Sequence, residues 1–172
     1  TIAHLRAPDG CPWDREQTHQ SLRPTLLEET YEVLTALDAE DMDALCEELG
    51  DLLLQILLHA QIAVEEGDFS LAQVIEKINA KIVRRHPHVF GDVVVSDAAE
   101  VTTNWEEIKQ EEKGEAGGSM LDDVPPTLPA LAQAQSYQRR VARVGFDWPD
   151  VEGVVTKVVE EIEELRRTSD AA

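Results

Sequence analysis

The segment from residue 44 to residue 66 constrains the fold more than any other part of the sequence. Its spacing predicts a helix, yet apolar residues cover most of the circumference of that helix. A helix that is apolar on nearly all sides has to be buried on nearly all sides, and a small monomeric bundle would struggle to cover it. We therefore expect this helix to lie centrally, at a homodimer interface. The residues concerned are Leu49, Leu52, Leu53, Leu54, Ile56, Leu57, Leu58, Ile62 and Val64.

The remainder of the sequence also has helical periodicity. Further helices are expected at about residues 24–37, 71–86, 97–112, 130–144 and 151–167. No alternating strand pattern of useful length occurs, so the predicted fold class is all-α. The capping candidates are Asp41 or Asp43 for the segment 44–66, Ser70 with Gln73 for the next helix and Ser96 for the one after, while Gly67, Pro87 and Gly145 mark helix ends.

Glycine and proline divide the chain into parts. Residues 1–21 are expected to be irregular because Pro8, Gly10 and Pro12 interrupt them. Residues 1–112 are expected to form a helical domain, residues 113–126 a linker or mobile loop, and residues 127–172 a C-terminal helical extension. A length of 172 residues accommodates one domain, or one domain with such an extension.

The chain has 15 basic and 35 acidic residues, which give a formal net charge of −20. This charge repels polyanions and argues against binding to a nucleic-acid polymer or to an anionic membrane. The most apolar stretch, residues 52–64, is too short to span a bilayer, which takes about 20 residues. No signal peptide is visible, and Cys11 and Cys46 cannot build a disulfide framework. We therefore expect a soluble cytoplasmic protein with free thiols.

Acidic residues recur at helical spacing on the first two long helices. Glu28, Glu29 and Glu32 belong to the first helix, and Glu48 and Asp51 to the second. Residues three or four apart share a helix face, and the short connection makes the two helices antiparallel neighbours. Four or five carboxylates would then meet in a small volume, which suits Mg²⁺ or Mn²⁺. The alternative is that they form solvated faces of acidic helices.

A basic stripe is expected on the helix at 71–86. Lys77, Lys81, Arg84 and Arg85 lie beside its apolar face and locally reverse the acidic character of the chain. They could form salt bridges with the acidic helices, or they could clamp phosphate oxygens. A carboxylate-bound cation next to a basic stripe provides what is needed to hold a nucleoside triphosphate.

Several aromatic residues accompany these charges. Trp105 lies four residues before Lys109, so it could pack in the core or could stack on a nucleotide while Lys109 reaches a phosphate. Trp13 is expected in a loop, where an exposed aromatic ring often binds a ligand. His86 and His88 flank a helix end and are expected to interact with its last carbonyl groups.

The acidic strings Glu-Glu-Thr-Tyr-Glu (28–32) and Glu-Leu-Gly-Asp (48–51) resemble the signature of the MazG nucleoside triphosphate pyrophosphohydrolases. The resemblance extends over nearly the whole chain. Five further strings support it: Gly-Cys-Pro-Trp-Asp (10–14), Arg-Arg-His-Pro-His-Val-Phe (84–90), Trp-Glu-Glu-Ile-Lys (105–109), Leu-Asp-Asp-Val-Pro (121–125) and Val-Gly-Phe-Asp-Trp (144–148).

The resemblance implies a four-helix core that dimerises and hydrolyses nucleoside triphosphates to the monophosphate and pyrophosphate with Mg²⁺. It also implies a role in clearing aberrant nucleotides. By position, the implied Mg²⁺ ligands are Glu29, Glu32, Glu48 and Asp51. Glu28 and Glu47 are implied either to activate the attacking water or to support the ligands, with no choice between them. The implied nucleotide contacts are Lys81, Arg84, Arg85, Trp105 and Lys109.

An incomplete second copy of the acidic pattern occurs near the end of the sequence. Glu160, Glu161 and Glu164 repeat the spacing of the first copy, but no Glu-x-x-Asp follows. Longer members of the family carry two complete sets, and half a set is expected to bind metal poorly. Two alternatives to the enzyme therefore stay open: a catalytically weak module that binds nucleotides or a partner protein, and a purely structural helical dimer.

Overall fold

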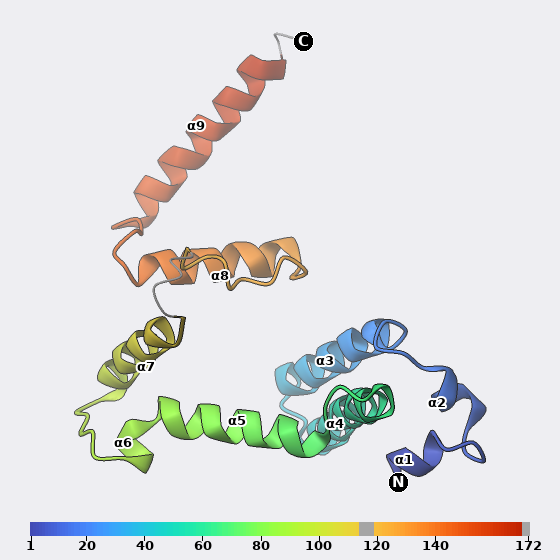
Figure 1. Ribbon diagram of the computed structural model, residues 1–172. Helices are drawn as coiled ribbons and strands as arrows, with labels where there is room; N and C mark the ends of the chain where they lie inside the picture. The colour runs from blue at the N-terminus through green and yellow to red at the C-terminus, as the bar shows by residue number, and fades with distance from the viewer. Residues whose placement is uncertain (114–118, 170–172) are drawn as a thin grey trace. The chain divides into compact units, whose positions relative to one another are not determined.

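The computed structural model describes residues 1–113 and 119–169, and these ranges contain helices, turns and bends but no strand (Figure 1). The all-α prediction is confirmed. The chain divides into two compact units, residues 1–109 and 110–172. The helices are α1 (Ile2–Leu5), α2 (Pro12–Glu16), α3 (Arg23–Asp38), α4 (Met42–Glu66), α5 (Leu71–Arg85), α6 (Pro87–Phe90), α7 (Ala98–Lys113), α8 (Ala130–Ala142) and α9 (Val151–Ser169).

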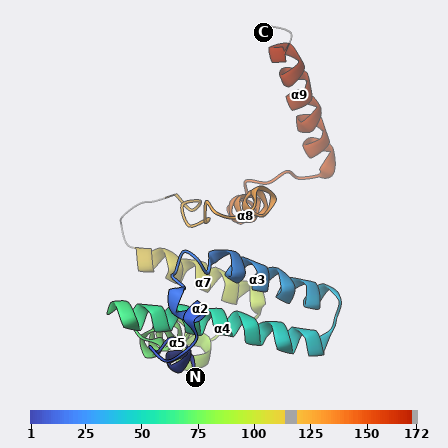
Figure 2. The ribbon, with the colours of Figure 1, turned by 90° about the vertical axis from the view of Figure 1, so that its right-hand side faces the viewer.

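The α3–α4 hairpin is the centre of the first unit, and Figure 2 shows its two helices lying side by side. The connection between them is short because α4 begins at once with a side-chain cap. The Asp41 carboxylate accepts hydrogen bonds from the backbone N–H groups of Asp43 and Ala44 at 3.1 and 3.0 Å. Gly67 ends α4 with a φ of 81°, a left-handed conformation that glycine adopts without strain. Of the two caps considered, Asp41 is therefore the one used.

An N-terminal strap, residues 1–22, packs on the second half of α4. Leu22 is buried with Leu58 and Ile62, and Ile2 and Leu54 pack against this cluster. The expectation that residues 1–21 are irregular is wrong in part, because α1 and α2 form within them. Helices of four and five residues are too short to show a periodic pattern. Here α1 packs on α4 through Ile2, and α2 is tied to α4 through Arg6, which donates to the Asp14 carbonyl and to the Glu65 carboxylate.

The α5 helix begins with the predicted capping box, in which the Ser70 hydroxyl and the Gln73 side chain each accept a backbone N–H. It ends before Pro87, which is itself the first residue of α6. In Figure 1, α5 leaves the end of α4 and extends away from the α3–α4 pair. The start of α7 differs from expectation, because Asp97 rather than Ser96 accepts the free N–H groups, from Ala99 and Glu100.

The second unit contains α8 and α9. Residues 119–126, placed in a linker by the sequence, form turns that contact α8. The Arg140 guanidinium donates to the backbone carbonyls of Met120 and Asp123 at 2.6 and 3.4 Å, and Val124 is buried. The rest of that expected linker, residues 114–118, lies outside the described residues. Within the described ranges, no helix combines the length and apolar character that crossing a bilayer requires.

One chain leaves much of the apolar surface of α4 uncovered. Leu49, Leu53, Ile56 and Val64 are 43–51% exposed, whereas Leu58, Ala60, Ile62 and Ala63 are buried. The expectation that α4 is surrounded is therefore not met within a single chain. Leu49, Leu53 and Ile56 follow one side of α4, so one chain leaves an apolar side of this helix exposed.

Candidate functional site

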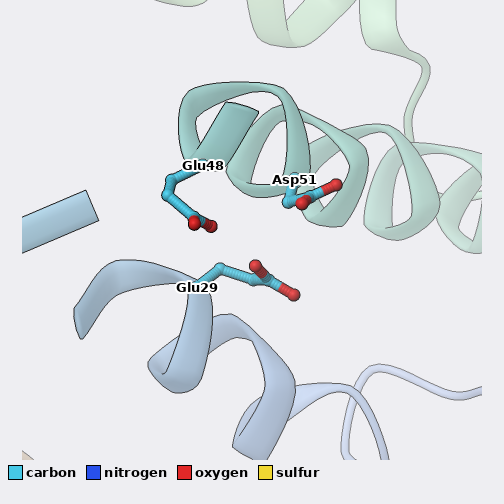
Figure 3. Close-up of side chains that lie close together, drawn as sticks. All are labelled: Glu29, Glu48 and Asp51. Carbon is cyan, nitrogen blue, oxygen red and sulfur yellow. The ribbon is translucent and has the colours of Figure 1, made fainter. Parts of the chain in front are cut away.

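Three carboxylates meet between α3 and α4. Glu29 extends from α3 toward Glu48 and Asp51 on α4 (Figure 3), and oxygen atoms of the three side chains lie within 4.8 Å of one another. Glu48 and Asp51 are three residues apart, so they leave α4 on the same face. The predicted meeting of the two acidic groups is thus present for these three residues.

Glu32 belongs to the same cluster. Its side chain shares a face of α3 with Glu29, and its charge raises the pKa of both Glu29 and Glu48. Partial burial is the largest cause of the raised pKa of Glu29, followed by Asp51 and Glu32. Partial burial is also first for Glu48, followed by Glu32, Asp51 and Glu47. Every charge that shifts these two pKa values is therefore a neighbouring carboxylate.

Such a cluster fits a hard divalent cation. Carboxylate oxygens are the ligands that Mg²⁺ and Mn²⁺ prefer, and a cation between them would remove the mutual repulsion that raises the two pKa values. Local structure positions the two carboxylates of α4, since the Asp41 cap sets where the helix begins and helical periodicity then sets where Glu48 and Asp51 point.

The two candidates for water activation lie beside the cluster in sequence but differ in their contacts. Glu47 is exposed on α4, and its charge acts on Glu48. Glu28 is exposed on α3, next to Glu29.

The basic residues of α5 lie on a different element from the carboxylates. Lys77 and Lys81 are exposed and line an open groove, here called the α5 groove. Arg84 is exposed on the next turn of the helix. The α5 groove is lined by Phe69, Gln73, Val74, Lys77, Ile78 and Lys81.

Arg85 and Trp105 come together at the far end of α5. The Arg85 guanidinium lies 6.0 Å from the centre of the Trp105 ring, a cation–π distance. The His86 ring meets Trp105 edge-on at 4.7 Å and is oriented by a contact of 2.6 Å between its Nδ1 and the carbonyl oxygen of Ile82. The prediction that a histidine here interacts with a terminal carbonyl is thus confirmed for His86, whereas Nδ1 of His88 is buried and has no hydrogen-bond partner among the described residues. Lys109 forms an ion pair of 3.2 Å with Glu106 on its own helix.

A histidine pair joins the N-terminal strap to α4, and the sequence analysis assigned it no role. The Nδ1 atoms of His19 and His59 are 2.7 Å apart, and the two rings are stacked. Burial, and then His19, lowers the pKa of His59. Asp51, Gln55 and His59 are spaced four residues apart, so they follow one side of α4; that spacing was the signal available in the sequence.

The second acidic group has a different environment. Glu160 and Glu161 are exposed on α9, and their carboxylates pair with Lys157 at 2.9 and 3.1 Å. These two bonds raise the pKa of Lys157. The arrangement agrees with a solvated, ion-paired helix face. Cys11 and Cys46 are free thiols, as expected.

Comparison with known proteins identifies relatives over most of the chain. The MazG nucleotide pyrophosphohydrolase domain matches residues 17–90. A nucleoside triphosphate pyrophosphohydrolase/pyrophosphatase MazG of Thermotoga maritima is 48% identical over 166 residues, covering 96% of this chain and 64% of that protein. A nucleoside triphosphate pyrophosphohydrolase of Escherichia coli K12 is 52% identical over 166 residues, covering 95% and 63%. The chain thus spans less than two thirds of the length of either relative.

A solved structure has a related fold. The crystal structure of a mazG-related protein from Thermotoga maritima matches with a TM-score of 0.52 and 33% sequence identity. The match covers 62% of this chain and 90% of that one.

Proposed function

Because this chain belongs to the MazG family, we propose that it hydrolyses nucleoside triphosphates to nucleoside monophosphates and pyrophosphate. Its substrates would be aberrant nucleotides. The observation that supports this proposal best is the meeting of Glu29, Glu48 and Asp51, with Glu32 beside them, between the two helices of the hairpin. Carboxylates arranged in this way would hold a divalent cation, to which triphosphate oxygens could also bind.

Glu29, Glu32, Glu48 and Asp51 would hold Mg²⁺, with Mn²⁺ as an alternative ion of similar ligand preference. When bound, the ion would neutralise negative charge on the phosphate oxygens and favour attack at phosphorus. We place the protein in the cytoplasm, a compartment that keeps thiols such as Cys11 and Cys46 reduced.

The side chains would carry out proton transfer and stabilise the charge that develops during the reaction. A water oxygen forms a bond to the α-phosphorus, the bond from the α-phosphorus to the bridging oxygen breaks, and pyrophosphate leaves. Glu28 or Glu47 takes the proton of the attacking water. Lys81, Arg84 and Arg85 stabilise charge on the departing pyrophosphate, while Trp105 and Lys109 contact the nucleotide.

The proposal includes a homodimer. Leu49, Leu53 and Ile56 follow one side of α4 and are exposed in one chain, which leaves a hydrophobic helix face without cover. A second copy offers the same self-complementary face, as a two-fold interface requires.

The test is pyrophosphate release with Mg²⁺ over a panel of normal and damaged triphosphates. We expect Glu48→Ala to lower turnover by about two orders of magnitude or more, because one of four ligands is lost. Asp38→Asn is the matched control: Asp38 is exposed at the last turn of α3, so its substitution should leave turnover unchanged.

Two results would contradict the proposal. Unchanged turnover in Glu48→Ala would remove the carboxylate cluster from the reaction. A wild-type protein that binds triphosphates but releases no pyrophosphate from any member of the panel would favour the nucleotide-binding module instead.

A further inference from the structure

A contact between two aromatic rings joins α7 to the far end of α5 (Figure 1). The ring planes of His86 and Trp105 meet at 86°, and their centres are 4.7 Å apart. Edge-to-face contact at this distance is a favoured arrangement of aromatic rings. The ring of His88 lies on α6, 5.6 Å from that of His86. Trp105 is thus held where α5, α6 and α7 come together.

The orientation of His86 is set by its own part of the chain. Its Nδ1 lies 2.6 Å from the carbonyl oxygen of Ile82, four residues earlier in the last turn of α5. Because a carbonyl oxygen only accepts hydrogen bonds, Nδ1 is the donor. Pro87 follows, and a proline restricts the backbone of the residue before it. The imidazole is therefore fixed by neighbouring residues and can act as a rigid support for the Trp105 ring.

A rigid support matters for a side chain that contacts a ligand. Trp105 is only partly buried on α7, so part of its ring is accessible. A free side chain that is immobilised when a ligand binds weakens the affinity by roughly two- to tenfold. A side chain that is already held in the free protein avoids this loss.

We propose that His86 is a positioning residue, which holds the Trp105 ring in the orientation that contacts the nucleotide. This inference rests on the proposed function, in which Trp105 contacts the nucleotide, and it adds the residue that orients Trp105. His86 acts through Trp105 and not on the reacting phosphate. Its loss should therefore raise KM and leave kcat unchanged.

Two substitutions of His86 separate its ring from its hydrogen bond. His86→Asn keeps a donor for the Ile82 carbonyl and removes the ring, whereas His86→Phe keeps a ring and removes the donor. In pyrophosphate release with Mg²⁺, we expect KM to rise about three- to tenfold in His86→Asn and to stay within about twofold of the wild-type value in His86→Phe. His4→Asn removes an exposed histidine of α1 and serves as the control, with an unchanged KM.

A double-mutant cycle shows whether His86 acts through Trp105. Trp105→Ala should raise KM by about tenfold or more. Adding His86→Asn to Trp105→Ala should then raise KM no further, because the ring that His86 positions is already gone.

A second measurement does not depend on turnover. The sequence has three tryptophans, and Trp13 and Trp148 are exposed, so Trp13→Phe/Trp148→Phe leaves Trp105 as the single fluorophore. In this parent protein, time-resolved fluorescence anisotropy follows the motion of the Trp105 ring. We expect His86→Asn to enlarge the amplitude of its fast motion, and His86→Phe to leave the amplitude near that of the parent. Titration with Mg²⁺ and α,β-methylene-ATP, which cannot be hydrolysed between its α- and β-phosphorus atoms, should show the same three- to tenfold loss of affinity in His86→Asn.

Three results would overturn the inference while leaving the proposed function in place. One is an unchanged KM in His86→Asn. Another is a rise in KM as large in the Trp105→Ala background as in the wild-type background. The third is equal motion of the Trp105 ring in the parent and in His86→Asn. By contrast, a wild-type protein that releases no pyrophosphate, but loses affinity for α,β-methylene-ATP through His86→Asn, would refute the hydrolysis and support the role of His86.

Discussion

Arg6 is the residue that ties the N-terminal strap to α4. Its side chain is only 6% exposed, and its guanidinium donates to both carboxylate oxygens of Glu65 at 2.8–3.1 Å. It also donates to two backbone carbonyls of the strap, those of Asp14 and Gln17. The side chain of Glu65 is 38% exposed, so water can hydrogen-bond to it when Arg6 is removed. Water replaces Arg6 less readily at the two backbone carbonyls.

These contacts predict an asymmetry between the two partners. Arg6→Met removes a cationic donor from two carbonyls, at about 1 kcal/mol each, and a solvent-screened ion pair of about 1 kcal/mol. The expected loss in the free energy of unfolding is therefore about 3 kcal/mol. Glu65→Gln removes only the ion pair and should cost about 1 kcal/mol. The coupling between the two substitutions should also be about 1 kcal/mol, because the ion pair is all that they share.

Urea unfolding of both single variants and the double variant, at one fixed protein concentration, measures these values. Arg15→Met is the matched control, because Arg15 is exposed on the same strap and donates to one carbonyl, that of Pro8, at 2.9 Å. We expect it to cost about 0.5 kcal/mol or less. Equal losses for Arg6→Met and Glu65→Gln, or a coupling near zero, would refute the reasoning.

Two predictions concern pH. Burial and then nearby carboxylates raise the pKa of Glu29 above 4.5, so this group stabilises the metal-free fold only while it is protonated, and the stability it contributes is lost as pH rises. Between pH 4.5 and a pH of about 7, the melting temperature of metal-free Glu29→Gln should therefore fall less than that of the metal-free wild-type protein. If the difference between the two melting temperatures stayed constant across this range, the result would be inconsistent with the cluster. Burial and then His19 lower the pKa of His59 below 6.5, so the unfolded chain takes up this proton first and stability is lost as pH falls from 6.5 toward the folded value. In thermal unfolding, His59→Gln should lose less stability than the wild-type protein as the pH falls below 6.5. If the melting temperatures of the two proteins changed with pH in the same way, the result would argue against the histidine pair.

Local signals in the sequence were sufficient for most elements of the fold. The long helices, the capping box at Ser70 and the left-handed glycine at residue 67 all follow from interactions within a few residues. The spacing of Glu48 and Asp51 is likewise local, because residues three apart share a helix face wherever the helix lies. The family resemblance came from such strings, and the comparisons confirm it.

Contacts between distant residues decided the rest. Helix α1 packs against α4 through Ile2, and α2 is tied to α4 through Arg6, which bonds both the Asp14 carbonyl and the Glu65 carboxylate. The pairing of His19 with His59 links residues 40 positions apart. The four-residue spacing of Asp51, Gln55 and His59 places His59 on one side of α4 but does not indicate His19 as its partner.

The amino-acid sequence by itself determined which residues are helical and which acidic side chains share a helix face, because these properties depend on neighbours within one or two turns. Only the tertiary structure decided that Glu29 reaches Glu48 and Asp51 across two helices, and that α5 takes its lysines away from them. The direction of a helix after a turn depends on the packing of whole surfaces, and much of the apolar surface of α3, α4 and α5 is exposed in one chain.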